Sequence, residues 1–173
     1  MSWIQTYTGK KFDLLNPDPA SICIEDIARS LSHQNRYGGH GLADYYSVAE
    51  HSMLIADWPE LPAKDRPWAL LHDATEAYLV DVPKPVKDLL PEYKVLEMKI
   101  QGVIAERFGL EPEIPQSVHV ADCRILMDEM QQNMVSPPQK WDGNFLPLGV
   151  KLQFYTFDDA EELFLRRLKE FFD

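Results

Sequence analysis

Cysteine is scarce in this sequence, and long apolar runs are missing. The two cysteines, Cys23 and Cys123, form neither a metal-binding motif nor a disulfide framework, so we expect a reducing, cytoplasmic setting. No apolar run approaches the ~20 residues of a membrane-spanning helix, so a membrane is not an expected partner. The first residues lack the basic stretch and apolar core of a secretory signal, and no signal peptide is expected.

Basic side chains are also in deficit. The chain carries 17 of them against 28 acidic side chains, which gives a formal net charge of −11 at pH 7. Such a charge repels a phosphate backbone, so a nucleic-acid polymer is not an expected partner. A small anionic substrate is still compatible with it if a metal ion or a local group of cations offsets the charge.

Length and composition predict one globular domain over residues 1–173. The chain has 173 residues, of which 45% are apolar. A short hairpin or arm with a turn at Thr8-Gly9-Lys10 comes first, and apolar residues at helical spacing follow it. We therefore predict an all-α fold. Its helices are expected over residues 24–31, 47–58, 65–79, 91–108, 117–134 and 156–171.

Several helix ends carry sequence signals. Ser47 and Glu50 have the spacing of a capping box, Ser117 is a candidate cap, and Gly109 ends a helix. The motif VPKP at 82–85 is expected to break the chain. The Pro- and Gly-containing connection over 131–155 has room for a short strand or a flap. The apolar stripe of the last helix consists of Ala160, Leu163, Phe164, Leu168 and Phe171.

Four ionisable residues lie where the helical pattern requires apolar ones. His51 shares an apolar stripe with Val48 and Ile55, and His72 lies within a run of apolar residues. Asp73 and Asp122 are likewise predicted to face inward. A buried carboxylate without a partner is costly, so two of them require a compensating positive charge.

Each of these residues also has an ordinary explanation. A lone histidine on an apolar face is commonly a hydrogen-bonded core residue, and an inward-facing aspartate commonly pairs with an arginine such as Arg66 or Arg124. One site accounts for all four at once, because two imidazoles and two carboxylates suit Zn²⁺, Mn²⁺, Fe²⁺, Co²⁺ or Ni²⁺. Four protein ligands leave a five- or six-coordinate ion with room for water, as catalysis requires.

The order of His51, His72-Asp73 and Asp122 resembles the signature of the HD-domain metal-dependent phosphohydrolases. The segments SVAEHS at 47–52 and LHDATE at 71–76 are similar to the first two motifs of the 5′-deoxynucleotidase branch. DVPKPVK at 81–87 resembles the loop that follows, and NRY at 35–37 lies where the branch has an arginine before an aromatic residue. The match spans residues 35–126 and implies a compact HD-type helical bundle with the motifs in its core.

The resemblance implies that the four residues hold one divalent transition metal, with Mg²⁺ as a companion of the substrate phosphates. Such an ion lowers the pKa of bound water from about 15.7 towards 7 and polarises a phosphoryl oxygen. Glu76 follows His72 by four residues and Asp73 by three, so it is expected on the same helix face. There it would orient the attacking water or move its proton, as the catalytic acid–base.

Substrate contacts are implied for the flanking motifs. Arg36 would bind two phosphate oxygens with its guanidinium, and Lys87, or Lys84 as a second choice, would add charge on the phosphate side. Asp81 would bind a sugar hydroxyl. Each of these residues is also compatible with an ordinary solvated or turn position.

Two further residues of the loop over 34–46 are substrate candidates. Tyr37 would pack against the sugar, at a position where the branch usually has tryptophan. His40, between glycines, would contact phosphate or a second metal. Packing and loop flexibility are the alternative explanations.

The expected function is divalent-metal-dependent hydrolysis of nucleotide phosphate bonds, above all of a deoxynucleoside 5′-monophosphate. Removal of triphosphate from a deoxynucleoside triphosphate, a reaction of related compact HD proteins, would use the same metal and Glu76. A non-catalytic nucleotide-sensing HD module is the alternative from another class, although such modules commonly lack part of the set. We also expect a homo-oligomer, a dimer or larger, formed through the N-terminal arm or the 131–155 connection.

Overall fold

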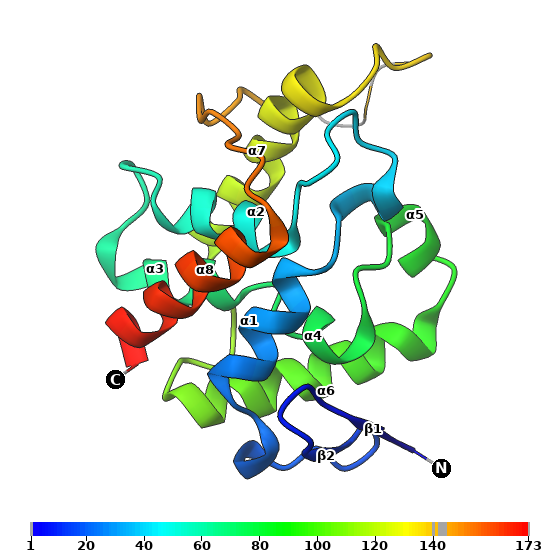
Figure 1. Cartoon of the computed structure of the whole chain (residues 1–173), viewed down its shortest axis with the longest axis vertical. Helices are drawn as coiled ribbons and strands as arrows, with labels where there is room; N and C mark the ends of the chain where they lie inside the picture. The colour runs from blue at the N-terminus through cyan, green and yellow to red at the C-terminus, as the bar shows by residue number, and fades with distance from the viewer. Residues whose placement is uncertain (1, 140, 142–144, 173) are drawn as a thin grey trace.

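Helices make up most of the regular structure in the computed structural model, which describes residues 2–139, 141 and 145–172 (Figure 1). They are α1 (Ile24–Ser32), α2 (Val48–Ala56), α3 (Arg66–Leu71), α4 (Glu76–Leu79), α5 (Lys84–Lys87), α6 (Pro91–Phe108), α7 (Gln116–Asn133) and α8 (Phe157–Phe172). The 3₁₀ helices η1 (Pro19–Ser21), η2 (Arg36–Gly39) and η3 (Ala63–Asp65) lie between them. The prediction of a mainly helical fold is confirmed. None of the described helices combines the length and the apolar character needed to cross a membrane.

The predicted N-terminal hairpin is present. β1 (Trp3–Gln5) and β2 (Lys11–Asp13) pair antiparallel, with Ile4 opposite Phe12. The turn between them includes Gly9 at a φ of 83°, a conformation that favours glycine. Phe12 is buried, and its ring stacks on that of Tyr78 in α4 with 3.9 Å between the centroids. The hairpin is therefore part of the packed structure and not a free arm.

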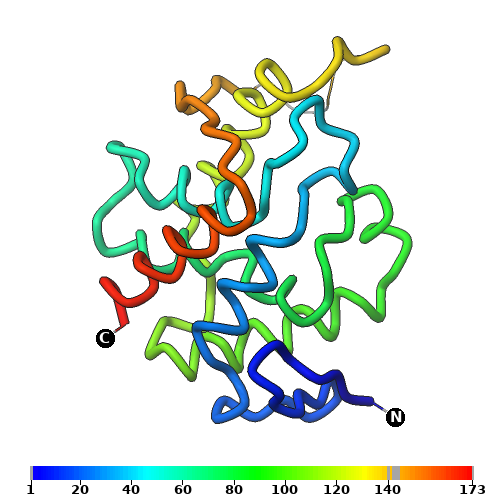
Figure 2. Tube along the Cα trace, in the orientation of Figure 1, coloured from blue at the N-terminus to red at the C-terminus, as the bar shows by residue number. Residues whose placement is uncertain are grey.

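The hydrophobic core forms around α1, α2 and α8, which pack against one another, while α3 packs on α2. Figure 2 traces α1 through the middle of the molecule with α8 beside it. Nearly every side chain of α2 is buried, including those of Glu50 and His51. Because this helix is covered on all sides, its polar groups must find partners inside the protein.

The apolar stripe of α8 is largely as predicted. Phe164 and Leu168 are buried. The prediction for Phe171 is wrong, because its side chain is 37% exposed. A stripe that advances by four residues from Phe164 and Leu168 reaches Phe172 instead, and the ring of Phe172 lies 4.8 Å from that of Phe108 in α6.

The helix predicted over 65–79 is divided into α3 and α4, with turns at 72–75 between them. In this stretch backbone amides bond to the carbonyl three residues back, as from Ala74 to Leu71 and from Glu76 to Asp73. Such a backbone rotates further per residue than an α-helix does. The side chains that follow these turns therefore point in other directions than an unbroken helix over 65–79 predicts.

The predicted helix ends are partly correct. Gly109 ends α6 in the left-handed conformation, as expected. Ser47 caps α2 by accepting from the amide of Glu50, but the Glu50 carboxylate binds a distant segment and does not complete the capping box. Ser117 does not cap α7, which begins one residue earlier, because its hydroxyl donates to the carboxylate of Asp65 at 2.6 Å. The VPKP motif breaks the chain only briefly, since α5 begins within it.

Residues 145–155, which we call the strap, lie against α7 and α2. The Asp128 carboxylate of α7 accepts hydrogen bonds from the three consecutive amides of 148–150, at 2.7–3.1 Å. The Glu50 carboxylate of α2 accepts from the amides of 153–155, at 2.7–3.0 Å. The sequence left room for a short strand in the connection over 131–155. No strand forms in its described part, because the strap amides bind side chains and not a second backbone segment.

Candidate metal centre

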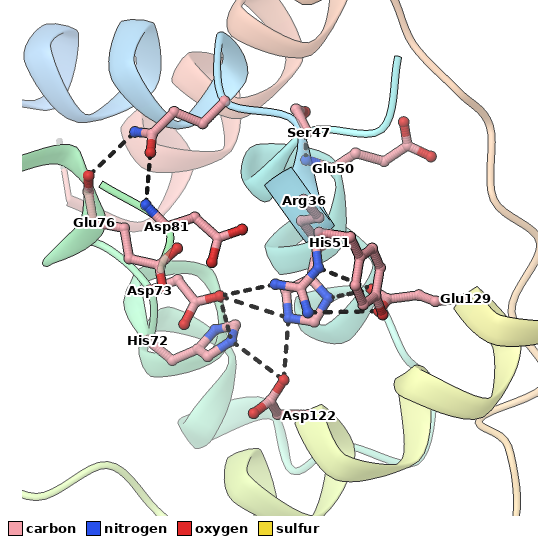
Figure 3. Close-up of polar contacts among 12 residues, drawn as sticks. Arg36, Ser47, Glu50, His51, His72, Asp73, Glu76, Asp81, Asp122 and Glu129 are labelled. Atoms are coloured by element: carbon pink, nitrogen blue, oxygen red, sulfur yellow. Dashed lines mark hydrogen bonds and ion pairs between the residues drawn. The ribbon is translucent and has the colours of Figure 1, made fainter. Parts of the chain in front are cut away.

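Side chains from three parts of the chain converge between α2, α7 and the turn that joins α3 to α4 (Figure 3). α2 supplies His51, the turn supplies His72 and Asp73, and α7 supplies Asp122. The four residues predicted to hold a metal are thus brought together. We refer to them as the centre.

The donor atoms of the centre have the separations that one shared ion would require. His51 Nε2 is 3.2 Å from Asp122 Oδ1, and His72 Nε2 is 3.9 Å from the same oxygen. Asp73 Oδ2 is 3.3 Å from His72 Nε2 and 3.7 Å from His51 Nε2. Ligand atoms that bind one ion at ~2.0–2.2 Å lie roughly 3–4 Å apart. His51, His72 and Asp122 could therefore hold a metal ion, with Asp73 next to them.

Both imidazoles are oriented by a hydrogen bond at Nδ1. His51 Nδ1 lies 2.6 Å from a carboxylate oxygen of Glu129, and His72 Nδ1 lies 2.7 Å from the carbonyl oxygen of Ala69. Both partners are acceptors, so Nδ1 carries the proton and Nε2 keeps its lone pair in the neutral ring. The two Nε2 atoms are buried and have no hydrogen-bond partner within the described ranges. A bound cation would satisfy both of them.

The charges at the centre also favour a cation. Burial lowers the pKa of His72, but the carboxylates of Asp73 and Asp122 outweigh this effect and raise that pKa to about 9. Burial raises the pKa of Asp73, yet the neighbouring imidazoles hold it well below its usual range. The carboxylates therefore draw positive charge to the imidazole nitrogens, in the form of a proton or of a metal ion.

Both aspartates face the interior of the centre, as predicted, but neither is fully buried. The side chain of Asp73 is 20% exposed and that of Asp122 is 38% exposed, whereas that of His51 is fully buried. The centre is therefore closed behind His51 and open to solvent where α7 carries Asp122.

Glu129 of α7 lies behind His51 and was not predicted as a site residue. Its carboxylate accepts from the ring of His51 and from the hydroxyls of Tyr46 and Tyr37, and it faces the guanidinium of Arg36. Burial raises the pKa of Glu129, but the charges of Arg36 and His51 lower it to about 2, so the group stays ionised.

One signal for Glu129 was present in the sequence. It follows Asp122 by seven residues, which places both side chains on one face of α7. Its partners Arg36, Tyr37 and Tyr46 come from a loop more than eighty residues away in the chain. Helical spacing carries no information on such contacts, so the pattern alone could not assign Glu129 to the site.

Arg36 and Tyr37 reach the centre from η2, in the loop before α2. Arg36 is largely buried, and its Nη1 lies 3.4 Å from Asp73 Oδ2. Tyr37 has a φ of 58°, which residues with a side chain rarely adopt. Its ring lies 5.8 Å from that of Trp141, and its hydroxyl binds Glu129. Arg36 thus contacts the centre through Asp73, whereas Tyr37 contacts Glu129 behind it.

Glu76 lies beside the centre at the start of α4, although the continuous helix expected to carry it there is absent. Its side chain is 4% exposed, and its Oε1 is 2.9 Å from Lys87 Nζ. Its Oε2 is buried and has no hydrogen-bond partner in the part of the chain that the structure describes. Burial and the charges of Asp73 and Asp81 raise the pKa of Glu76 to about 8, against the opposing charge of Lys87.

Lys87 and Asp81 border Glu76. Lys87 Nζ lies between the carboxylates of Glu76 and Glu97, at 2.9 and 2.8 Å. Burial lowers the pKa of Lys87, but the two carboxylates raise it well above its usual range. Asp81 is partly buried, and burial raises its pKa. It follows Val80, a β-branched residue at a φ of 70°, which is a strained backbone of the kind found near functional sites.

His40 and Lys84 are not brought into the centre. His40 is exposed at the end of η2. The side chain of Lys84 is 84% exposed and pairs with Asp88, with 3.1 Å between Nζ and Oδ2. Neither side chain contacts the centre among the described residues.

A second group of possible metal ligands, His33, Asp158 and Glu161, lies near the surface. His33 Nδ1 is 3.0 Å from the carbonyl oxygen of Arg29, and the guanidinium of Arg29 pairs with Glu161 at 2.9 Å. That guanidinium already neutralises Glu161 and repels a cation. In both groups the potential ligand atoms lie close together. The centre differs because its two buried Nε2 atoms have no hydrogen-bond partner in the described structure.

Comparison with curated proteins finds relatives of this chain. The "Uncharacterized protein YfdR" of Escherichia coli (strain K12) is 43% identical over 150 residues, which cover 86% of this chain and 79% of YfdR. The "Uncharacterized protein RCAP_rcc00048" of Rhodobacter capsulatus is 38% identical over 124 residues, which cover 68% of this chain and 63% of that protein. No family model matches the sequence. The chain belongs to the same family as YfdR.

Proposed function

We propose that this protein is a divalent-metal-dependent hydrolase of nucleotide phosphate bonds, and that deoxynucleoside 5′-monophosphates are its substrates. One observation carries the proposal. Two buried imidazoles direct Nε2 atoms, which have no hydrogen-bond partner among the described residues, at the carboxylates of Asp73 and Asp122. This ligand set is the one by which the sequence resembles the HD-domain phosphohydrolases, and a mainly helical fold is compatible with an HD-type bundle.

The centre and Glu76 have the properties that this reaction needs. A divalent ion held by the four ligands would supply Lewis acidity towards a phosphate ester and a lowered pKa for water. Glu76 Oε2 has no hydrogen-bond partner among the described residues, and in the metal-free protein burial and the charges of Asp73 and Asp81 raise the pKa of Glu76 to about 8, so that this carboxyl can hold a proton near neutral pH. Its Oε1 stays bound to Lys87, which fixes the side chain beside the centre.

Cationic side chains support an anionic substrate in a protein with a net charge of −11. Arg36 contacts Asp73 at 3.4 Å, a distance that leaves this donor weakly engaged and able to turn to a phosphate oxygen. Lys87 adds a second positive charge beside Glu76. In this proposal Tyr37 packs against the sugar and Asp81 binds a sugar hydroxyl.

Removal of triphosphate from a deoxynucleoside triphosphate is the second candidate function. The exposure of Asp122 favours it, because a longer phosphate chain could extend into solvent on the side of the centre where Asp122 lies. A non-catalytic nucleotide sensor is a third possibility. The buried Oε2 of Glu76, which lacks a hydrogen-bond partner in the described ranges, counts against it, since a sensor has no use for a group that moves protons.

A product assay tests the proposal. Metal-free protein is reloaded with Mn²⁺, Co²⁺ or Mg²⁺ and incubated with nucleoside mono- and triphosphates. We expect release of inorganic phosphate from dAMP with at least one of the metals. Tripolyphosphate from dATP, without phosphate from dAMP, would support the second candidate. Nucleotide binding without turnover under every condition would overturn both hydrolase functions in favour of a sensor.

A further inference from the structure

Two groups of donors meet at the two oxygens of the Glu129 carboxylate. His51 Nδ1 and the hydroxyl of Tyr46 each lie 2.6 Å from Oε1. The hydroxyl of Tyr37 donates to Oε2. The guanidinium of Arg36 faces both oxygens, with Nε 3.3 Å from Oε1 and Nη2 3.5 Å from Oε2. Oε1 therefore contacts the ring of His51 together with Tyr46 and Arg36 of the loop, and Oε2 contacts Tyr37 and Arg36 of the same loop.

We propose that Glu129 is a positioning residue that couples this loop, residues 36–46, to the metal-ligating nitrogen of His51. The inference rests on the metal centre of the proposed function and does not depend on the substrate. It predicts that the loop contacts strengthen metal binding and that a bound metal holds the loop in place.

The contact with His51 determines how that ring meets a metal. Hydrogen bonding at Nδ1 fixes both the tautomer and the plane of the ring, and a carboxylate acceptor makes the opposite nitrogen more basic. His51 and Glu129 are both fully buried, so no water can replace this contact without a rearrangement of the core. Loss of the Glu129 charge would therefore weaken the ligand as well as the packing around it.

The contacts with the loop hold a strained backbone. Tyr37 has a φ of 58°, and such a conformation persists only where surrounding contacts enforce it. Its hydroxyl bond to Glu129 is such a contact. Arg36 adds a second link, since its guanidinium touches Glu129 on one side and the centre residue Asp73 on the other. The loop cannot move away without leaving the Glu129 charge poorly compensated.

A purely structural role for Glu129 makes a different prediction, and α7 offers a matched control. Asp128 is adjacent, 3% exposed, and accepts three backbone hydrogen bonds from the strap. No side chain of the centre is among these partners. If Glu129 only stabilises the core, Glu129→Gln and Asp128→Asn should affect the protein in the same way.

Metal affinity separates the two roles. Metal-free wild type, Glu129→Gln and Asp128→Asn are titrated with Zn²⁺ against a chelator, and the visible spectra of their Co²⁺ forms are compared. We expect Glu129→Gln to bind Zn²⁺ about 10- to 100-fold more weakly and to change the Co²⁺ spectrum, as is typical when the partner of a ligating histidine is lost. Asp128→Asn should lower the melting temperature but leave both metal readouts unchanged.

Hydrogen exchange of the loop amides gives the reciprocal measurement. Because coupling between two sites is mutual, Zn²⁺ should slow exchange over residues 36–46 in wild type but much less in Glu129→Gln. Tyr37→Phe removes a single hydroxyl and leaves the contact between Glu129 and His51 in place. It should weaken Zn²⁺ binding by less than Glu129→Gln does, and it provides the test if Glu129→Gln does not fold.

Three results would overturn the inference: a folded Glu129→Gln protein with wild-type Zn²⁺ affinity, an equal loss of affinity in Asp128→Asn, or an unfolded Glu129→Gln together with wild-type affinity in Tyr37→Phe. None of these measurements includes a nucleotide. If the loop and metal binding are coupled but no nucleotide is hydrolysed, the proposed function alone is refuted. If nucleotides are hydrolysed but the loop and metal binding are not coupled, only the role of Glu129 is refuted.

Discussion

α2 and α7 each carry a pair of adjacent ionisable residues, and the two members of each pair have different surroundings. On α2, Glu50 binds the strap and points away from the centre, whereas His51 faces the centre (Figure 3). On α7, Asp128 binds the strap, whereas Glu129 binds His51. Adjacent positions of an α-helix point ~100° apart, so one helix can serve two environments.

The comparison shows what separates a structural ionisable group from a candidate metal ligand. Glu50, Asp128 and His51 are all buried. The two carboxylates each accept hydrogen bonds from three successive amides, whereas His51 Nε2 has no hydrogen-bond partner in the described structure and lies 3.2 Å from a carboxylate oxygen of Asp122. Burial alone therefore does not identify the site. The site is identified by a buried atom that lacks a hydrogen-bond partner and is directed at other potential metal ligands.

The largest expected effect is the loss of metal on removal of a ligand. Asp73→Ala takes away the carboxylate that lies within 3.7 Å of both ring nitrogens, so bound metal should fall from stoichiometric to undetectable by elemental analysis. Lys84→Ala, which alters an exposed ion pair, is the control and should retain the metal. Full metal content in Asp73→Ala would exclude this carboxylate from the ligand set.

Glu76→Gln should separate metal binding from turnover. The amide keeps an acceptor for Lys87 but cannot take up a proton, so nucleotide hydrolysis should fall by about 10²- to 10⁴-fold while metal content is unchanged. Steady-state rates and elemental analysis on one preparation would check this. A rate close to that of wild type would refute the proton-handling role.

Metal affinity should rise with pH in the neutral range. The pKa of His72 is raised from 6.5 to about 9, so a metal must displace a proton at neutral pH. Below about pH 9 each unit of acidification should weaken binding about tenfold for one proton released, as measured by chelator competition. The same shift stabilises the metal-free protein below pH 6.5, and that contribution is lost as pH rises through about 9. A pH-independent affinity would contradict the assignment of His72 as a ligand.

A strap residue should affect stability and not the metal. Glu50→Gln places an amide donor against three backbone amides and should lower the free energy of unfolding by about 1–3 kcal/mol. Denaturant unfolding measures this change, and metal content should equal that of wild type. A loss of metal with intact folding would show that the two environments on α2 are not separate.

The smallest effect is expected at the second donor group. Asp158→Asn should change neither metal content nor stability by a measurable amount, because Arg29 already compensates the group formed with Glu161. A reduced metal content in this variant would show that proximity of donor atoms is sufficient for binding.

The sequence predicted those parts of the molecule that depend on local pattern. The apolar stripe placed His51 in the core, and Gly109 marked the end of α6. Contacts between distant segments overrode local signals elsewhere. Glu50 has the spacing of a capping box, but the strap amides take its carboxylate. Ser117 likewise binds Asp65 and leaves α7 uncapped.

The sequence predicted the four residues of the centre, but not every residue that contacts them. The four residues of the centre follow from residue type and order, whereas Glu129 depends on partners that only the folded chain brings together. Glu76 lies beside the centre through a tightened turn, although an unbroken helix was the expected route. Hydrogen-bond pairing thus carries information about function that spacing in the sequence does not.

In the proposed centre, His51 and His72 share one divalent ion through their Nε2 atoms. ¹⁵N spectra of the histidine side chains, recorded as Zn²⁺ is added to metal-free protein, test this claim most directly. We predict that the Nε2 signals of both residues shift together and saturate at a single equivalent, while both Nδ1 atoms keep their protons. Nε2 signals that do not respond, or that respond at different Zn²⁺ concentrations, would contradict it.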